Sequence, residues 1–429
     1  MRAALLCFSF AALAAGCGVL DRALDVEAPS RIPAAALEDP SKATLLLNGA
    51  IADFDCAFGA QVVVSGLVGE ELTDASQTAA RWPYDRREIA PNDALYASGS
   101  CEGIGLYTPL SVARFSADNI LKRLEGWTDA DVVNRTSMIA TAAAYSGYSH
   151  VLLGEMFCEG VLLDENLVPG GLATRQQLFE RAEQRFTRAI EAARASSNTD
   201  ILNMALVGRA RTRLNLGKKA EAATDARLVP NNYVRNATAS SVASRRENRV
   251  FAQNNQGQAV SIAPEYRNLT TGGVADPRVR ATDTGKTNAD GTRVFVQNKY
   301  ASLTTSLPIA TWREAQLIIA EAAVQTNPAE AVSIINALRT RAGVALPAFS
   351  SSNPAEIMNQ VIEERRRELF LEGHHLGDMI RYNLPFRPAT GTVFPAPTHG
   401  NPKGGTYGAT RCLPVPNVER FNNPLIPSA

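Results

Sequence analysis

The sequence has no surplus of charge of either sign, because 43 basic and 43 acidic residues leave its 429 residues with a net charge of zero. Proteins that bind nucleic acids or anionic membrane surfaces usually carry an excess of lysine and arginine. We therefore expect no nucleic-acid partner. A hydrophobic content of 45% fits an exported globular protein. The chain is long enough to bury a large core, in one unusually large domain or in two interlocked ones.

The sequence also lacks the common signatures of catalysis. It has no Gly-x-Ser-x-Gly elbow, no His-Glu-x-x-His pair, no phosphate-cradling Gly-x-x-x-x-Gly-Lys and no Gly-x-Gly-x-x-Gly after a strand. The adjacent His374 and His375 would point about 100° apart on a helix and cannot easily share one ion. We therefore expect no catalytic residues, no cofactor and no metal site.

Long apolar runs are scarce. The run Ala3–Ala15 follows the basic Arg2, is too short to span a bilayer, and ends in small residues before Cys17. This pattern predicts a signal peptide over residues 1–16, lipidation of Cys17 and a lipid-anchored tether over residues 17–40. An ordinary signal peptide, with Cys17 incidental, is the alternative, since the lipobox lacks its preferred leucine. After Cys17 we expect no apolar run long enough to cross a membrane.

Cysteines are few, but their number is informative. Once the signal peptide is removed and Cys17 is lipidated, four remain: Cys56, Cys101, Cys158 and Cys412. An even count in an oxidising compartment permits two disulfides, and the spacing leaves their pairing open. No two of the four lie close enough in sequence for a zinc knuckle, so metal binding is the weaker interpretation.

Helical patterns come in pairs from Ser111 onward. Leu206, Ala210 and Leu214 repeat at intervals of four, Gly217 is a natural C-terminal cap, and an alanine stripe follows it. Helix, glycine turn and alanine-rich helix is the order typical of a tetratricopeptide-like unit.

Two identical Asn-Pro-Ala-Glu tetrapeptides, at 327–330 and 353–356, each supply an N-cap, a first-turn proline and a capping-box glutamate. Both predict the start of a helix. The predicted fold is all-α: a tetratricopeptide-like helical-hairpin scaffold with long irregular loop insertions and minor β structure. Its expected parts, within a domain over residues 41–429, are an N-terminal part (41–110), helical repeats (111–228 and 311–382) and loop-rich insertions (229–310 and 384–429).

Residues 364–381 place charges of both signs inside an apolar helical pattern. Because the apolar spacing continues through Arg365 or Arg366, some of these charges should be partly buried. Buried charges persist when they are paired, so Arg366 and Arg381 are expected to clamp carboxylates and lock two helices together. The expected carboxylates include Glu368, Glu372 and Asp378.

This segment resembles the signature helix of the SusD/RagB-like family of outer-membrane nutrient-binding lipoproteins, roughly Glu-Arg-x-x-Glu-Leu-x-x-Glu-Gly-x-Arg-x-x-Asp-Leu-x-Arg. Met379 replaces the usual leucine, and His375 stands where arginine is most frequent. Further segments that resemble family motifs, and together extend over much of the chain, are 276–279, 299–300, 312–322, 331–343 and 413–424.

The resemblance implies a lipid-anchored protein of the cell outer membrane, exposed at the cell surface, that binds an oligosaccharide or another oligomeric nutrient such as a peptide. It also implies delivery of this ligand to a TonB-dependent, SusC-like β-barrel transporter, on which family members sit as a lid. No catalytic step is needed. The alternative is a lipoprotein adaptor whose helical repeats bind another envelope protein and carry no small ligand.

The candidate ligand site lies in the N-terminal part. Sugars are held by flat aromatic faces and by amide, carboxylate and guanidinium groups at their hydroxyls. Characterised SusD-like proteins bind ligand partly in the corresponding stretch. The predicted ligand-binding residues are Asp74, Trp82, Tyr84, Arg86, Asn92 and Tyr96. The alternative is that Trp82 and Tyr84 only fasten a long loop to the helical core, as most aromatic residues do.

Overall fold

The computed structural model describes residues 37–288 and 290–427. The predicted signal peptide, the lipidation site Cys17 and the tether up to residue 36 lie outside the described residues. The chain divides into two units after Lys42. The end of the first unit contains the short 3-10 turn η2 (Pro40–Lys42), and the other elements of the described residues belong to the second unit.

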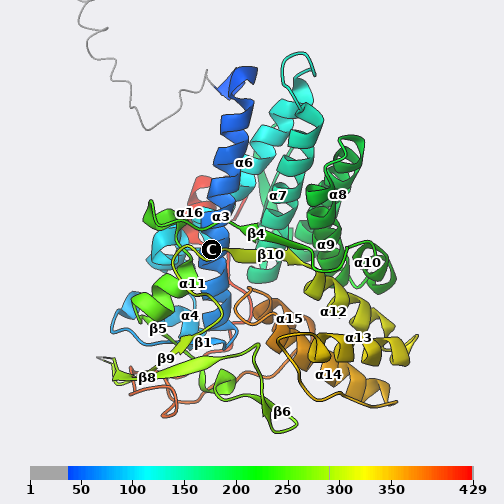
Figure 1. Cartoon of the computed structure of the whole chain (residues 1–429). Helices are drawn as coiled ribbons and strands as arrows, with labels where there is room; N and C mark the ends of the chain where they lie inside the picture. The colour runs from blue at the N-terminus through cyan, green and yellow to red at the C-terminus, as the bar shows by residue number, and fades with distance from the viewer. Residues whose placement is uncertain (1–36, 289, 428–429) are drawn as a thin grey trace, which may run out of the picture. The chain divides into compact units, whose positions relative to one another are not determined.

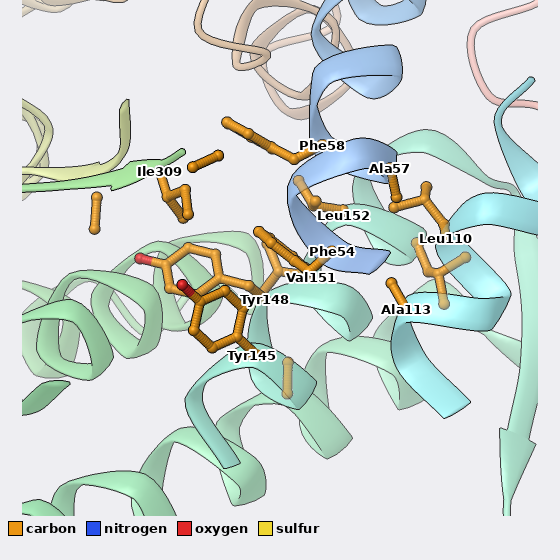
Figure 2. Packing of buried hydrophobic residues seen from close by; sticks show 14 of the residues in the cluster. Phe54, Ala57, Phe58, Leu110, Ala113, Tyr145, Tyr148, Val151, Leu152 and Ile309 are labelled. Atoms are coloured by element: carbon orange, nitrogen blue, oxygen red, sulfur yellow. The ribbon is translucent and has the colours of Figure 1, made fainter. Parts of the chain in front are cut away.

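The helix α3 (Ala43–Val68) forms part of the core of the second unit. Its Phe54 stacks on Phe58 with ring centroids 5.9 Å apart, and meets the edge of Tyr145 at 5.1 Å (Figure 2). The expectation of no later membrane-length apolar run was wrong, because one described helix, Pro40–Val68, is long and apolar enough. Since 83% of its most apolar window is buried inside the protein, this apolarity is that of a core helix.

Each long helix after α3 packs against the next long helix of the chain (Figure 1). This succession of helical hairpins confirms the predicted all-α scaffold with minor β structure. The helices are α6 (Tyr107–Gly126), α7 (Arg135–Met156), α8 (Arg175–Ala195), α9 (Thr199–Asn215), α10 (Lys219–Ala226), α12 (Trp312–Ala323), α13 (Pro328–Thr340) and α14 (Pro354–Glu368), followed by the short α15 (His375–Arg381).

Small residues let three of these helices approach closely. Phe186 of α8 lies against Gly147 of α7 and Gly208 of α9, and a Cβ atom at those glycines would come within 2.8 Å and 2.3 Å of its ring atoms. Tyr148 meets the same ring edge-on, with centroids 5.0 Å apart. The two glycines therefore set the spacing of α7, α8 and α9, because any larger residue would displace Phe186.

Both Asn-Pro-Ala-Glu tetrapeptides open helices, as predicted. The Asn327 side chain accepts a hydrogen bond from the backbone N–H of Glu330 (3.4 Å) at the start of α13. The Asn353 side chain accepts one from Ala355 (2.9 Å) at the start of α14. These caps satisfy backbone donors that a helix leaves without partners.

The β structure of the described residues consists of five two-stranded antiparallel sheets. The pair β1–β5 joins the N-terminal part to the first loop-rich insertion, which holds most of the other strands. The pairs are β1 (Leu72–Asp74) with β5 (Val260–Ile262), β2 (Glu159–Leu163) with β3 (Pro169–Thr174), β4 (Val234–Ala237) with β10 (Leu307–Thr311), β6 (Thr270–Thr271) with β7 (Val274–Ala275), and β8 (Ala281–Thr287) with β9 (Arg293–Gln297).

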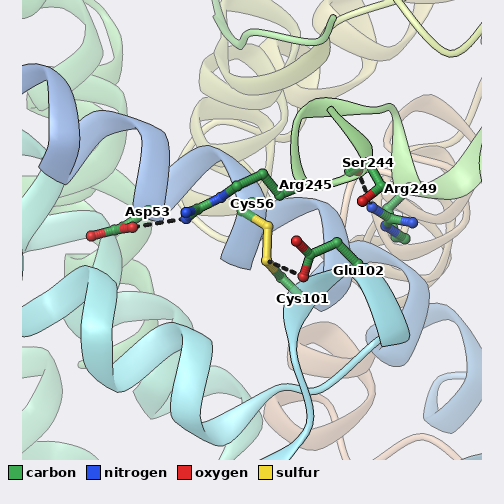
Figure 3. Close-up of a disulfide and its surroundings, with 7 residues drawn as sticks. All are labelled: Asp53, Cys56, Cys101, Glu102, Ser244, Arg245 and Arg249. Carbon is green, nitrogen blue, oxygen red and sulfur yellow. Dashed lines mark hydrogen bonds and ion pairs between the residues drawn. A yellow bond between two sulfur atoms is a disulfide. The ribbon is translucent and has the colours of Figure 1, made fainter. Parts of the chain in front are cut away.

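Two disulfides give the pairing that the spacing left open. Cys56 of α3 bonds to Cys101, which lies in a 3-10 turn just before α6 (Figure 3). Cys158, after the end of α7, bonds to Cys412, 254 positions further along the chain. The second disulfide fastens the C-terminal insertion to the helical scaffold.

Buried carboxylates of the signature segment are each shared by several cations. The Glu368 side chain is fully buried, and its oxygens lie 2.6 Å from Arg341, 3.1 Å from Arg313 and 3.3 Å from Arg278. Arg313 belongs to α12, Arg341 follows α13, and Arg278 belongs to the first insertion. One carboxylate of α14 therefore joins three other parts of the chain.

The expected clamp by Arg381 is present. Its guanidinium lies 2.9 Å from Asp378 and 2.5 Å from Glu321 of α12. Arg365 reaches the same Asp378 at 2.8 Å and is 4% exposed, so the apolar face of α14 does carry a charge inward.

Arg366 has a different partner from those expected. It pairs with Glu363 at 3.2 Å, and its guanidinium lies 4.3 Å from the centroid of the Tyr266 ring. Neighbouring residues on a helix point about 100° apart, so when Arg365 faces inward its neighbour faces the first insertion instead. The assignment of Glu368, Glu372 or Asp378 to Arg366 was therefore wrong.

Glu368→Gln should destabilise the fold strongly. The substitution keeps the shape of the side chain but leaves three largely buried arginines without their shared charge, which typically costs about 3–5 kcal/mol. Urea denaturation measures the change in the free energy of unfolding. The control is Glu125→Gln, whose pair with Arg188 at 2.7 Å is solvent-exposed and should contribute less than about 1 kcal/mol. Equal losses in the two variants would contradict this account.

Glu314, in the first turn of α12, is a buried carboxyl with no hydrogen-bond partner for either oxygen among the described residues. Its nearest charged neighbour is Arg211, whose Nε lies 3.9 Å away, and the His374 ring nitrogen lies at 3.8 Å. Loss of hydration on burial raises the pKa of Glu314 to about 8, although Arg211 and Arg365 oppose this shift. The carboxyl is therefore protonated in the folded protein at neutral pH.

The free energy of unfolding should fall as the pH rises toward about 8. The unfolded chain releases the Glu314 proton near pH 4.5, whereas the folded chain holds it until about pH 8, so the folded state binds more protons in this window. The stabilisation by Glu314 is complete below its pKa in the unfolded chain and is lost as the pH rises past its pKa in the folded protein. Glu314→Gln should remove this part of the dependence in urea titrations at a series of pH values, and an unchanged slope would refute the assignment.

Candidate ligand-binding site

A segment of the N-terminal part and the C-terminal insertion meet at the predicted site. The N-terminal segment contains η3 (Ala79–Arg81), α4 (Trp82–Arg86) and α5 (Ala94–Ser98). The C-terminal insertion lies against it, since the backbone N–H of Gly408 donates to the Arg86 carbonyl at 2.8 Å. A site in this region is therefore built from segments more than 300 residues apart.

Arg87 holds these segments together, although the sequence did not single it out. It is 1% exposed, donates to the carbonyl of Pro388 at 2.5 Å and lies 3.3 Å from the Glu70 carboxylate. Its guanidinium also lies 4.5 Å from the ring centroids of both Phe386 and Tyr407. An arginine so placed combines an ion pair with two cation–π contacts, which fixes the C-terminal insertion against α4.

Asp74 lies beneath this region and is fully buried. Its carboxylate accepts from Arg81 at 3.2 Å and from the backbone N–H and hydroxyl of Ser76 at 2.9 Å each. The Lys403 ammonium lies 3.2 Å from Asp74 and 2.9 Å from Asp290. Every contact of Asp74 is thus internal, and the side chain holds the C-terminal loop in place.

Trp82 is half-buried and offers part of its ring to solvent. Its indole N–H donates to the Ser76 carbonyl at 3.0 Å, and the ring packs against a small cluster that contains Phe394 and Tyr407. The Lys403 ammonium lies 5.5 Å from the ring centroid. The hydrogen-bonding edge of the indole is therefore used internally.

Arg86 and Asn92 are the most accessible polar members of the predicted set. Arg86 is half-buried, and its Nε lies 2.9 Å from the exposed Glu88 carboxylate, a pair that a ligand could displace at little cost. Asn92 is exposed. Arg86 also lies next to Gly405 of the exposed loop over residues 404–406.

Tyr84 and Tyr96 point into the protein. Tyr84 is 2% exposed and donates its hydroxyl to the carbonyl of Ile104 at 3.2 Å. Tyr96 is 1% exposed and stacks on Phe157, with centroids 6.1 Å apart. Burial raises the pKa of both hydroxyls well above the ordinary value for tyrosine. In this conformation both rings fasten the segment to the core, and a binding role for any of the six residues stays a prediction.

A cavity of about 180 Å³ opens beside Glu70. Tyr266 and His375 line it with their rings edge-on, 5.9 Å apart. Burial raises the pKa of Glu70 to about 8, although Arg87 opposes this shift, and burial lowers the pKa of His375 to about 4. The apolar part of the lining is Ile362, Met379, Leu384 and Pro385. The remaining lining residues are Glu265, Glu363, Arg366 and Arg387, so the cavity combines an apolar wall with polar groups of both charge signs.

One group of side chains in the described part of the chain has the spacing of metal ligands, namely Cys56, Cys101 and Glu102. Both cysteines form a disulfide with each other (Figure 3). A disulfide provides no thiolate, and thiolates are the form in which cysteine binds metals. This group therefore does not constitute a metal site.

Lys403→Met should loosen the predicted site. The substitution keeps the length of the side chain but leaves Asp74 and Asp290 buried without their shared cation, which typically costs about 3–5 kcal/mol. Urea denaturation gives the stability, and hydrogen exchange of the loop over residues 398–406 should accelerate. Lys286→Met, at an exposed position of β8, is the matched control and should change neither. Slow exchange retained in Lys403→Met would refute the bridging role.

Solved structures share the fold of this chain. A putative sugar binding protein from Bacteroides vulgatus is similar with a TM-score of 0.68 at 18% identity, over 90% of this chain and 97% of its own. A SusD superfamily protein from Bacteroides fragilis is similar with a TM-score of 0.68 at 16% identity, over 91% of this chain and 99% of its own. A SusD-like carbohydrate binding protein from Bacteroides vulgatus is similar with a TM-score of 0.64 at 15% identity, over 90% of this chain and 97% of its own. This chain thus has the fold of the SusD-like helical proteins.

A match in sequence accompanies the likeness in fold. Residues 252–417 match the model of the SusD family, and this range includes the signature segment 364–381. No curated protein matches the chain. The match of residues 252–417 and the shared fold confirm the resemblance to the SusD/RagB-like family that the motifs indicated.

Proposed function

We propose that this protein is a cell-surface lipoprotein that binds an oligosaccharide, or another oligomeric nutrient such as a peptide, and delivers it to a TonB-dependent, SusC-like transporter of the outer membrane. The match of residues 252–417 to the model of the SusD family, together with the shared fold, is the observation that carries the proposal. Two solved structures with this fold are named as a carbohydrate binding and a putative sugar binding protein, which supports a carbohydrate as the ligand.

The proposed ligand lies over the Trp82 surface, which we define as Trp82, Arg86 and the exposed loop over residues 404–406. The accessible part of the indole ring would contact the apolar C–H face of a sugar, while the Arg86 guanidinium and the backbone of the loop hydrogen-bond its hydroxyls. Asn92 would extend these contacts. The cavity beside Glu70 offers hydrogen-bonding groups and an apolar wall for a further part of the ligand.

Under this proposal Asp74, Tyr84 and Tyr96 act indirectly. Asp74 positions the C-terminal loop through Lys403, and the two tyrosines hold the segment that carries Trp82. Binding and delivery need no bond-breaking step, so the proposal requires neither a catalytic residue nor a cofactor. The lipid at Cys17 would anchor the protein beside its transporter.

Trp82→Ala should weaken ligand binding. Calorimetry of the mature protein against a panel of glycans and peptides first identifies a ligand, and its affinity for the variant should then be lower by roughly tenfold or more, because a central aromatic contact is lost. Trp82→Phe keeps a ring and should retain most of the affinity.

The matched control for this experiment is Phe421→Ala, which removes a ring that is 74% exposed and lies outside the Trp82 surface. Its affinity should equal that of the wild type. Unchanged affinity in a folded Trp82→Ala variant would reject the site. Failure of the wild type to bind any glycan or peptide would reject the ligand class and favour the adaptor function.

A further inference from the structure

A second cavity, lined mainly by cationic side chains, lies beside Glu368. Its volume is about 210 Å³, and it shares no lining residue with the cavity beside Glu70. Glu368 is the one carboxylate of its lining within the described residues. The cationic side chains of the lining are Arg278, Arg280, Lys299, Arg313 and Arg341. The cavity is therefore a basic site, quite unlike the Trp82 surface.

The ion-pair network behind this cavity contains more cations than carboxylates. Its five carboxylates are Asp276, Glu363, Glu364, Glu368 and Glu372. The seven cations paired with them are Arg278, Lys299, Arg313, Arg339, Arg341, Arg366 and Arg367. The described network thus has two positive charges in excess. Most of these side chains are buried or half-buried, so water screens the excess only weakly.

Arg280 adds a third uncompensated charge at the mouth of the cavity. Its side chain is exposed, and its guanidinium makes no hydrogen bond or ion pair within residues 37–288 and 290–427. Arg313 and Arg341 keep 24% and 28% of their side-chain surface accessible, although both bind Glu368. The cavity therefore has one free guanidinium and two that are only partly enclosed.

We propose that this cavity binds a tetrahedral oxyanion, namely a sulfate or phosphate group. Guanidinium groups donate paired hydrogen bonds to oxyanions, and Lys299 adds a compact positive charge. The donors converge from α12, the end of α13 and the first insertion, and a tetrahedral group presents acceptor oxygens in several directions. A carboxylate has two oxygens in one plane and would satisfy fewer of these donors. The bound group offsets the excess charge of the network.

The oxyanion has two possible sources, a free inorganic ion or an ester group on a bound carbohydrate. Calorimetry of the mature protein in a chloride buffer of fixed ionic strength distinguishes them with four probes: inorganic sulfate, inorganic phosphate, a sugar sulfate and the same sugar without sulfate. Saturable binding of either inorganic ion is the expected result. Tighter binding of the sugar sulfate than of free sulfate identifies a carbohydrate source, and equal binding identifies the free ion.

Arg280→Glu tests the site directly, because this exposed, unpaired side chain is not needed for folding. Affinity for the oxyanion should fall by about ten- to a hundredfold, as expected for the loss of a charge-assisted contact, while Arg280→Lys should lose less. Arg194→Glu, the same charge change at an exposed position of α8, is the matched control and should bind as the wild type does.

Trp82→Ala should leave oxyanion binding unchanged, which separates this site from the proposed nutrient site. Failure of both inorganic ions to bind saturably would overturn the proposal. So would equal loss of affinity in Arg280→Glu and Arg194→Glu, because the effect would then reflect net charge alone.

Discussion

The helices of the second half of the chain depend on carboxylates that are each shared by several cations. Glu368 binds three arginines, Glu364 binds two, and Asp378 binds two. In a poorly hydrated interior such groups are favourable only when every partner is in place. Because the partners come from α12, α13, α15 and the first insertion, none of these parts can shift without leaving a buried charge unpaired. These shared ion pairs therefore fix the relative positions of the helices from which the loop-rich insertions extend.

Much of the fold could be predicted because its signals are local. The repeated tetrapeptides, the alanine stripe and the signature segment each mark a helix within a few residues. The helix α3 escaped prediction because it is apolar on nearly all sides and includes the β-branched run Val62–Val64, so no amphipathic period marks it. The partner of Arg366 escaped for another reason. Whether that residue or its neighbour Arg365 faces inward is decided by tertiary packing, which the spacing alone leaves open.

The candidate site was predictable in residue type but not in exposure. Trp82 and Arg86 reach the surface, whereas Tyr84 and Tyr96 are buried against the helical core. The residues that organise the region were missed, because Arg87 and Lys403 act on partners hundreds of positions away and no local pattern marks such contacts. The nearest signal was the run of acidic residues between Glu70 and Asp74, which proved to lie under the site rather than on it. The basic cavity beside Glu368 could not be predicted for the same reason, because its cations come from three separate segments and no local pattern brings them together.

The disulfide between Cys158 and Cys412 gives this arrangement a temporal consequence. The surface around Trp82 is complete only when the C-terminal insertion lies against α4, and this insertion is synthesised after the helices α3 to α15. A polypeptide that stops before this insertion therefore has most of its helices but no assembled Trp82 surface. The bond between Cys158 and Cys412 fastens this late insertion to the residue that follows α7, so the Trp82 surface is assembled only after the helical scaffold has been synthesised.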